Sequence, residues 1–167
     1  MIITKKWLTD NNACKEGIEW FEKQPDKDEF VILDNIKFDW SNWYLSIRLD
    51  KIGKVKYAVY AARLVLKTDD DLSKQAILAA EEYIKNPCVR TADAAWAATW
   101  AADAAADATW AARAATWAAA AAADAACAAR AACAAARAAR AATDAATAAG
   151  ADNNIEQKII KYGREML

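Results

Sequence analysis

The stretch TADAAWAATWAADAAADATWAARAATWAAAAAADAACAARAACAAARAARAATDAATAAG, residues 91–150, decides the fold. Alanine fills 38 of its sixty positions, proline is absent from it, and its first glycine is its last residue. Alanine has the highest helix propensity because it loses no side-chain entropy when a helix forms. The stretch, called the Ala segment below, is therefore predicted to be helical.

The residues of the Ala segment that are not alanine recur at spacings of three and four. Such spacings are how one face of a helix appears in a sequence. The first row is Asp93, Trp96, Trp100, Asp103, Asp107, Trp110, Arg113 and Thr116, and the second is Asp124, Cys127, Arg130, Cys133, Arg137, Arg140, Asp144 and Thr147. Nearly all the chemistry of the segment is thus predicted to lie on one stripe, the Ala-segment stripe.

The two rows mirror one another about position 120, so that Trp100 corresponds to Arg140 and Asp103 to Arg137. A hairpin bent there would set an acidic first arm beside a basic second arm, although any lattice of threes and fours is palindromic about some point. One unbroken helix would be about 90 Å long, whereas a compact domain of this size has a radius of gyration of about 15 Å. Compactness therefore favours a hairpin or several closely packed helices. The absence of a glycine or proline stop signal inside the run argues against such a break in the helix.

Length and charge predict a single domain, 1–167, made of an N-terminal half (1–90), the Ala segment (91–150) and a C-terminal helix (151–167). Basic and acidic residues balance at 22 and 23, and the balance holds within each part. Without a basic excess, nucleic acid is not expected as a partner. The longest uncharged piece of the Ala segment, 114–123, is half of a membrane span, so no membrane partner is expected either. Four cysteines without a paired framework, and no signal peptide, favour the cytoplasm.

The remaining chain predicts short helices, so the expected fold class is all-α. Helices are expected over 13–24, ended by Pro25, and from Trp40, with Asp39 as its cap. Further helices are expected over 53–66, where Tyr60 and Arg63 lie, over 72–86, and from Ile155 after two asparagines. The apolar run 30–33 fits a strand or a helix equally.

Residues for catalysis are scarce, and we expect no enzyme, no cofactor and no metal. The chain has no histidine, which excludes Ser–His and Cys–His nucleophile pairs and histidine metal sites. Cys127 and Cys133 are six residues apart with no second pair at zinc spacing, and are better interpreted as small apolar residues. Asp103 and Asp107 lie one turn apart and are better interpreted as solvated or ion-paired than as cation ligands. Four glycines supply no phosphate-binding loop.

Two short motifs resemble a known family. Residues 13–21, ACKEGIEWF, resemble the "ACxxGxxWF" opening of a family of immunity proteins found in bacterial polymorphic-toxin loci and prophages. Residues 39–45, DWSNWYL, resemble that family's "DWLLWL" helix, and the Ala segment resembles its alanine-rich tail. The chain departs from the family at Ser41 and Asn42, where apolar residues are usual, and in using Trp for Tyr in the tail. The resemblance implies a small cytoplasmic binding protein and transfers no catalytic residue.

Three classes of binding function follow from these features. The first is an inhibitor that binds a protein, either an immunity protein against a toxin or a phage-borne inhibitor of a bacterial defence system such as CRISPR. The second is a sponge that holds a nucleotide signal between Trp faces and Arg side chains. The third, an ice binder, needs threonines in line every eleven residues, and the threonines here do not recur so.

The first class is favoured, with a protein partner and an open oligomeric state. Its candidate binding residues lie on the Ala-segment stripe, because Trp and Arg are the preferred anchors of interfaces. They are Trp100, Asp103, Trp110, Arg130, Arg137 and Arg140. The alternative interpretation is that the tryptophans of the stripe belong to the core.

Overall fold

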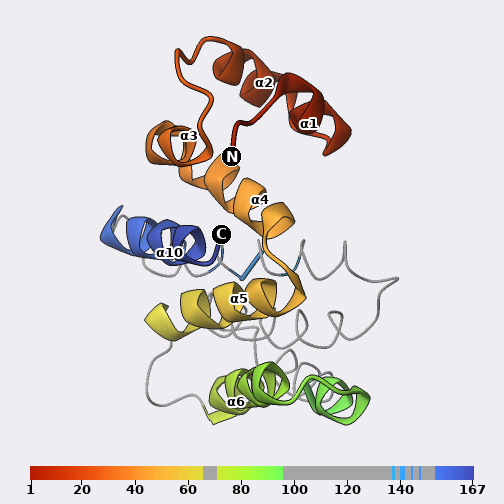
Figure 1. Cartoon of the computed structure of the whole chain (residues 1–167). Helices are drawn as coiled ribbons and strands as arrows, with labels where there is room; N and C mark the ends of the chain where they lie inside the picture. Colours follow the sequence, from red (N-terminus) through yellow and green to blue (C-terminus); the bar gives the residue numbers. More distant parts are fainter. Residues whose placement is uncertain (66–70, 96–136, 138–139, 142–143, 145–146, 148–152) are drawn as a thin grey trace. The chain divides into compact units, whose positions relative to one another are not determined.

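The described residues of the chain are all-α, as the sequence predicts. The computed structural model describes residues 1–65, 71–95, 137, 140–141, 144, 147 and 153–167 (Figure 1). Within these ranges the one β-type pairing is an isolated antiparallel bridge between Ile2 and Asp28. The chain divides into two compact units, Met1–Ser41 and Asn42–Leu167, and the division falls inside a helix.

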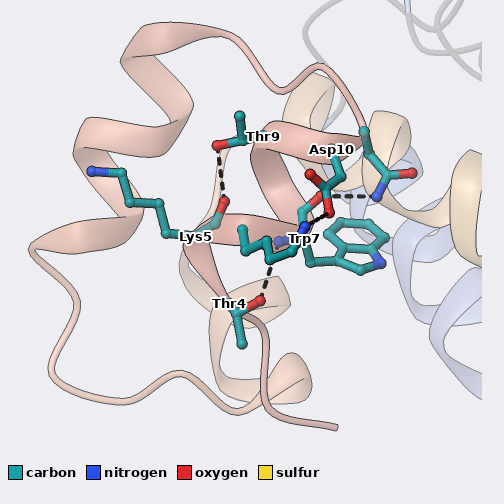
Figure 2. A network of polar contacts seen from close by, with 7 residues as sticks. Thr4, Lys5, Trp7, Thr9 and Asp10 are labelled. Atoms are coloured by element: carbon teal, nitrogen blue, oxygen red, sulfur yellow. Dashed lines mark hydrogen bonds and ion pairs between the residues drawn. The ribbon is translucent and has the colours of Figure 1, made fainter.

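The first unit opens with a short helix, α1 (Lys5–Asp10), which the sequence pattern did not predict. Its start is capped by Thr4, whose Oγ1 accepts the backbone N–H of Trp7 at 3.1 Å (Figure 2). Figure 2 also shows the Thr9 hydroxyl donating to the Lys5 carbonyl at 3.0 Å. The chain leaves the helix through Asn12 at φ 60°, a left-handed conformation that asparagine tolerates better than most residues.

Two further helices complete most of the first unit. Helix α2 (Lys15–Glu22) confirms the helix expected over 13–24, and Cys14 is its N-cap. Helix α3 (Glu29–Asn35) resolves the ambiguous apolar run as helix. The Asp28 carboxylate caps α3 by accepting the N–H of Phe30 at 2.9 Å, and Ile32 and Leu33 are buried. A cap placed two residues before the run of four apolar residues is thus what favours helix over strand here.

Helix α4 (Phe38–Arg48) starts two residues before the position expected from the sequence. Asp39 lies in its first turn and is not the residue before the helix, so the prediction of Asp39 as the cap was wrong. An aspartate in the first turn still interacts favourably with the helix dipole, which explains the acidic signal at this end. Tyr44 and Leu45, on the part of α4 in the second unit, are fully or almost fully buried.

The second unit is centred on α5 (Lys51–Val65), which contacts both α6 (Asp71–Lys85) and α10 (Asn153–Glu165) (Figure 1). These helices confirm the three expected over 53–66, over 72–86 and from Ile155. Helix α10 begins two residues earlier than expected, so Asn153 and Asn154 lie inside the helix and the prediction that they precede it was wrong. Their shared core includes Tyr57, Ile77 and Ile159, none of them more than 1% exposed. Helix α10 comes close to α5 because Gly163 carries no side chain: a Cβ there would stand 2.9 Å from Tyr57 Cε2.

The described part of the Ala segment is helical at every position. Residues 91–95, 137, 140–141, 144 and 147 all have helical conformation, and Ala92, Ala95 and Ala141 are buried. Buried alanines let neighbouring helices pack at short interaxial distance. The hairpin turn considered at position 120, and with it the choice between a hairpin and several helices, falls outside the described residues.

Among the residues that the structure describes, no helix is both long enough and apolar enough to cross a bilayer.

Candidate functional site

Two of the six candidate binding residues, Arg137 and Arg140, lie in the described part of the chain. Arg140 is exposed and Arg137 is half-buried. Their neighbour Asp144, one turn after Arg140, is only 1% exposed. The Nε atom of Arg140 lies 3.3 Å from Asp144 Oδ1. The other four candidates, Trp100, Asp103, Trp110 and Arg130, lie outside the described residues.

The Arg140 side chain both pairs with a buried carboxylate and remains partly exposed to solvent. A buried carboxylate needs a charged or hydrogen-bonded partner, because burying an isolated ion costs several kcal/mol. Arg140 supplies that partner for Asp144 along one helix face. The Arg140 side chain is still 49% exposed, so part of it faces solvent. One residue of the Ala-segment stripe therefore combines a structural contact with an accessible cationic surface.

The motif residues of the N-terminal unit pack into one cluster, which we call the motif cluster: Cys14, Gly17, Trp20 and Trp40. Cys14 Sγ accepts the backbone N–H of Gly17 at 3.3 Å. A Cβ at Gly17 would lie 3.3 Å from the same sulfur, which is a tight contact, and 3.8 Å from Trp40 Cε2, which is an ordinary van der Waals distance, so this position of α2 lies close to the Trp40 indole. The spacing Cys-x-x-Gly therefore has a physical reason here, a thiol cap followed by a point of close packing.

The two tryptophans of the motif cluster meet edge to face. The ring centroids of Trp20 and Trp40 are 6.0 Å apart with 61° between the planes. The Nζ atom of Lys37 lies 5.3 Å from the centroid of the Trp40 ring, within the range of a cation–π contact. Both tryptophans are half-buried. The cluster thus combines large apolar surface, fixed geometry and partial exposure, which are properties of interface anchors.

A second set of side chains lies on the outer face of α5. One side of this helix is buried, whereas Lys56 and Arg63 are exposed and Tyr60 is half-buried. These residues are spaced by four and three, so they form one line along the helix. We call Lys56, Tyr60 and Arg63 the α5 stripe. The sequence pattern located Tyr60 and Arg63 on a helix without assigning them a role. The feature that could have indicated this surface is the charge of α5, which contains four basic residues and no acidic one.

Neighbouring helices hold two members of the α5 stripe in place. The ring of Tyr60 stacks on that of Tyr162, with centroids 4.0 Å apart and planes 13° apart. The Nε atom of Arg63 donates to Glu81 Oε1 at 2.5 Å. The hydrogen bond to Glu81 raises the pKa of Arg63, more than burial lowers it. Burial, with smaller effects of Tyr60 and Glu165, raises the pKa of Tyr162, so this tyrosine is neutral at physiological pH.

One thiol has a distinct electrostatic environment. Cys88 Sγ lies 3.5 Å from the Thr91 hydroxyl, and the backbone N–H of Cys88 donates to the same oxygen at 3.2 Å. Hydrogen bonding from Thr91 lowers the pKa of Cys88, with a smaller contribution from Arg90. Over the ranges that the structure describes, no three Cys, Asp or Glu side chains gather closely enough to hold a metal ion.

Comparisons with known proteins add no relative. No family model, no curated protein and no solved structure matches the chain.

Proposed function

We propose that this chain is a non-enzymatic binding protein of the immunity class, which neutralises a toxin by direct contact in the cytoplasm. The observation that carries the proposal is the motif cluster. The residues in which the sequence resembles immunity proteins, on two separate helices, pack against one another around Gly17. They leave Trp20 and Trp40 half-buried at fixed mutual geometry. Shared packing gives these motif positions a common structural role.

The accessible side chains supply the chemistry of a protein interface. Trp, Tyr and Arg carry most of the binding energy in protein complexes, because they combine large area with directed polar groups. The described surface offers the accessible parts of two half-buried tryptophans in the first unit and the exposed part of Arg140 in the second. Arg130, Arg137 and Arg140, with Trp100, Asp103 and Trp110, remain the proposed contacts on the Ala-segment stripe. A protein is the proposed partner, since the balanced charge does not favour nucleic acid.

Inhibition of a bacterial defence system is the second candidate function, because it needs the same kind of surface. The nucleotide sponge is less favoured by the described aromatic pairs. A base sandwiched between two rings requires them parallel and about 7 Å apart, twice the usual stacking distance. Tyr60 and Tyr162 already touch, and Trp20 and Trp40 are inclined by 61°.

Co-expression with genes found beside this one tests the proposal. A toxin gene adjacent to this chain's gene is expressed from an inducible promoter, with and without the chain, and growth is measured. The proposal expects growth to be restored by the chain. A neighbouring gene whose product is lethal and remains lethal in the presence of folded chain contradicts immunity, and rescue of phage infection in a defended host supports the second candidate.

A charge-matched pair of variants then assigns the surface. Replacing Arg130, Arg137 and Arg140 by glutamine keeps helix propensity while removing the planar donor fork. The control replaces Lys15, Lys23 and Lys85, all exposed in the described surface, by glutamine. We expect the arginine variant to lose protection and the lysine variant to keep it. Equal protection by both variants would remove the arginines from the proposed interface.

A further inference from the structure

The outer face of α5 concentrates positive charge in a chain whose formal net charge is −1. The helix holds Lys51, Lys54, Lys56 and Arg63 and no acidic residue. Lys54 is set apart from the other three, since it is partly buried, and burial lowers its pKa while Asp50 raises it. The exposed charge along the middle and end of the helix is therefore that of Lys56 and Arg63, the two cations of the α5 stripe.

The cations and the tyrosine of the stripe form a regular array. Lys56 and Arg63 are seven residues apart, which corresponds to about 10.5 Å along a helix axis. Tyr60 lies between them in sequence and on the same face. Because α5 is buried on its other sides, at Val55, Ala58, Val59 and Ala62 among others, the stripe cannot turn inward without unpacking the unit. Lys56 and Arg63 thus face solvent, with the half-buried Tyr60 between them.

Contacts to α10 and α6 reduce the freedom of the stripe before any partner binds. Tyr60 is stacked on Tyr162, and Arg63 is tied through Nε to Glu81. Arginine carries five N–H donors, and this bond uses one of them. The Arg63 side chain is 50% exposed, so further donors remain available to a second carboxylate. A side chain that is already ordered loses less entropy on binding, which raises affinity.

We infer that the α5 stripe, with Tyr162 beside it, binds an acidic polypeptide segment. Carboxylates of the segment pair with Lys56 and Arg63, and an apolar or aromatic side chain between them covers the Tyr60–Tyr162 stack. The inference rests on the proposed function only in that the segment would belong to the partner that the chain neutralises. It adds a contact surface, a charge sign and a spacing that the function alone does not supply.

An acidic polypeptide fits this surface better than a nucleic acid does. Nucleic-acid binding draws most of its affinity from neutralising many phosphates along an extended track. The stripe offers two exposed cations, one of which already shares a carboxylate. Two cations separated by one aromatic ring match a short segment with carboxylates on either side of an apolar residue. Arg63 is suited to such a carboxylate because its planar fork fits carboxylate geometry.

Selection from a random dodecapeptide library on the immobilised full-length chain provides an unbiased probe. The inference expects the enriched peptides to carry net negative charge with an aromatic or aliphatic residue between acidic ones. Their binding should weaken as salt rises, because the pairs are solvent-accessible. Enrichment of no sequence, or of sequences without net negative charge, overturns the inference.

Two double variants then place the bound peptide. Lys56→Gln with Arg63→Gln removes both cations of the stripe, and affinity for the selected peptides, measured by fluorescence anisotropy, should fall about tenfold or more. Lys23→Gln with Lys85→Gln removes the same charge from other exposed positions and should change affinity less than about twofold. Thermal melting followed by circular dichroism checks that both variants stay folded. Equal affinity of the two variants overturns the inference, as does tighter binding of a single-stranded oligonucleotide that the stripe variant abolishes.

Failure of this inference and failure of the proposed function give different experimental results. If the stripe variant still protects cells from the toxin as well as the unmodified chain does, the stripe is rejected and the immunity function stands. If acidic peptides bind through the stripe but no neighbouring toxin is neutralised, the function is rejected and the acidic-segment site stands.

Discussion

Tyr60 on α5 and Tyr162 on α10 stack ring on ring, with centroids 4.0 Å apart and 13° between planes. The residue after Tyr162 explains how the two helices come so close. A Cβ on Gly163 would lie 2.6 Å from Leu45 Cδ1 and 2.9 Å from Tyr57 Cε2. Leu45 and Tyr57 are both fully buried, so neither has free space into which to move. A single missing methyl group therefore permits the stack that flanks the α5 stripe.

Gly163→Ala should lower the free energy of unfolding by about 1–3 kcal/mol, the usual cost of overpacking a core. Gly17→Ala is the matched control, because its Cβ would meet its nearest neighbour, Cys14 Sγ, at 3.3 Å. We expect the control to stay within about 1 kcal/mol of the unmodified chain, since the gain in helix propensity offsets the tighter contact. Urea unfolding measures both. A Gly163→Ala chain as stable as the original would show that α10 does not pack this closely on α5.

Tyr57→Phe should stabilise the chain by about 1 kcal/mol. Tyr57 is fully buried, burial raises the pKa of its hydroxyl, and the Oη atom has no hydrogen-bond partner among the described residues. Removing a buried hydroxyl that makes no hydrogen bond removes its desolvation cost while keeping the ring. Tyr60→Phe, at a half-buried position, serves as the control and should be close to neutral. A loss of stability in Tyr57→Phe would reveal a bonded hydroxyl.

Arg140→Gln tests the structural half of the role assigned to this residue. It leaves the carboxylate of Asp144 buried without its arginine, so the free energy of unfolding should fall by about 1–3 kcal/mol, less than for a fully buried pair because Arg140 is half-exposed. The comparison is Arg63→Gln, whose pair with Glu81 is more accessible and should contribute at most about 1 kcal/mol. Chemical denaturation of the two variants side by side measures the difference. If the Arg140→Gln chain were as stable as the unmodified chain, the Arg140–Asp144 ion pair would make no net contribution to the free energy of unfolding.

Cys88 should react with iodoacetamide at lower pH than an ordinary thiol, whose pKa is 9.0. The Thr91 hydrogen bonds lower the pKa of Cys88, and Thr91→Val should move the midpoint of the pH–rate profile upward. Because the folded-state pKa is depressed, the thiolate contributes stability above the pKa of the unfolded thiol. That contribution is lost as pH falls through the folded pKa. Site-resolved mass spectrometry gives the profile, and a midpoint at or above 9.0 would contradict this account.

Helix existence was predictable from the sequence wherever a cap or a stop signal accompanied apolar spacing. Helix α2 ends at Glu22, shortly before Pro25, as the proline predicts. Likewise, α6 ends at Lys85, just before Asn86-Pro87, and the next helix begins at residue 89. The prediction failed at α1, a six-residue helix too short for periodicity to reveal, whose signal is the Thr4 cap. It also misplaced the start of α4, because an acidic residue favours the first turn as well as the cap.

The candidate site was less accessible from sequence than the fold. The motif residues could be marked, but only the structure shows that Trp20 and Trp40 meet edge to face, since they lie on different helices. The α5 stripe went unassigned for a similar reason: its boundaries depend on which faces of α5 are buried by α6 and α10. The sequence placed Asp144 on the Ala-segment stripe without deciding whether it is exposed, and in the structure it is buried and paired with Arg140. Periodicity identifies the face on which a residue lies without showing what covers that face.

Titration of a purified toxin with the purified chain tests the central claim most directly. A binding protein that neutralises by direct contact must occupy its target molecule for molecule. The account therefore predicts that toxin activity falls linearly with added chain and reaches its minimum at a fixed molar ratio, with a complex of that ratio seen by light scattering. Loss of toxin activity at far less than stoichiometric amounts of chain, continuing with time, would show catalytic turnover and contradict the account.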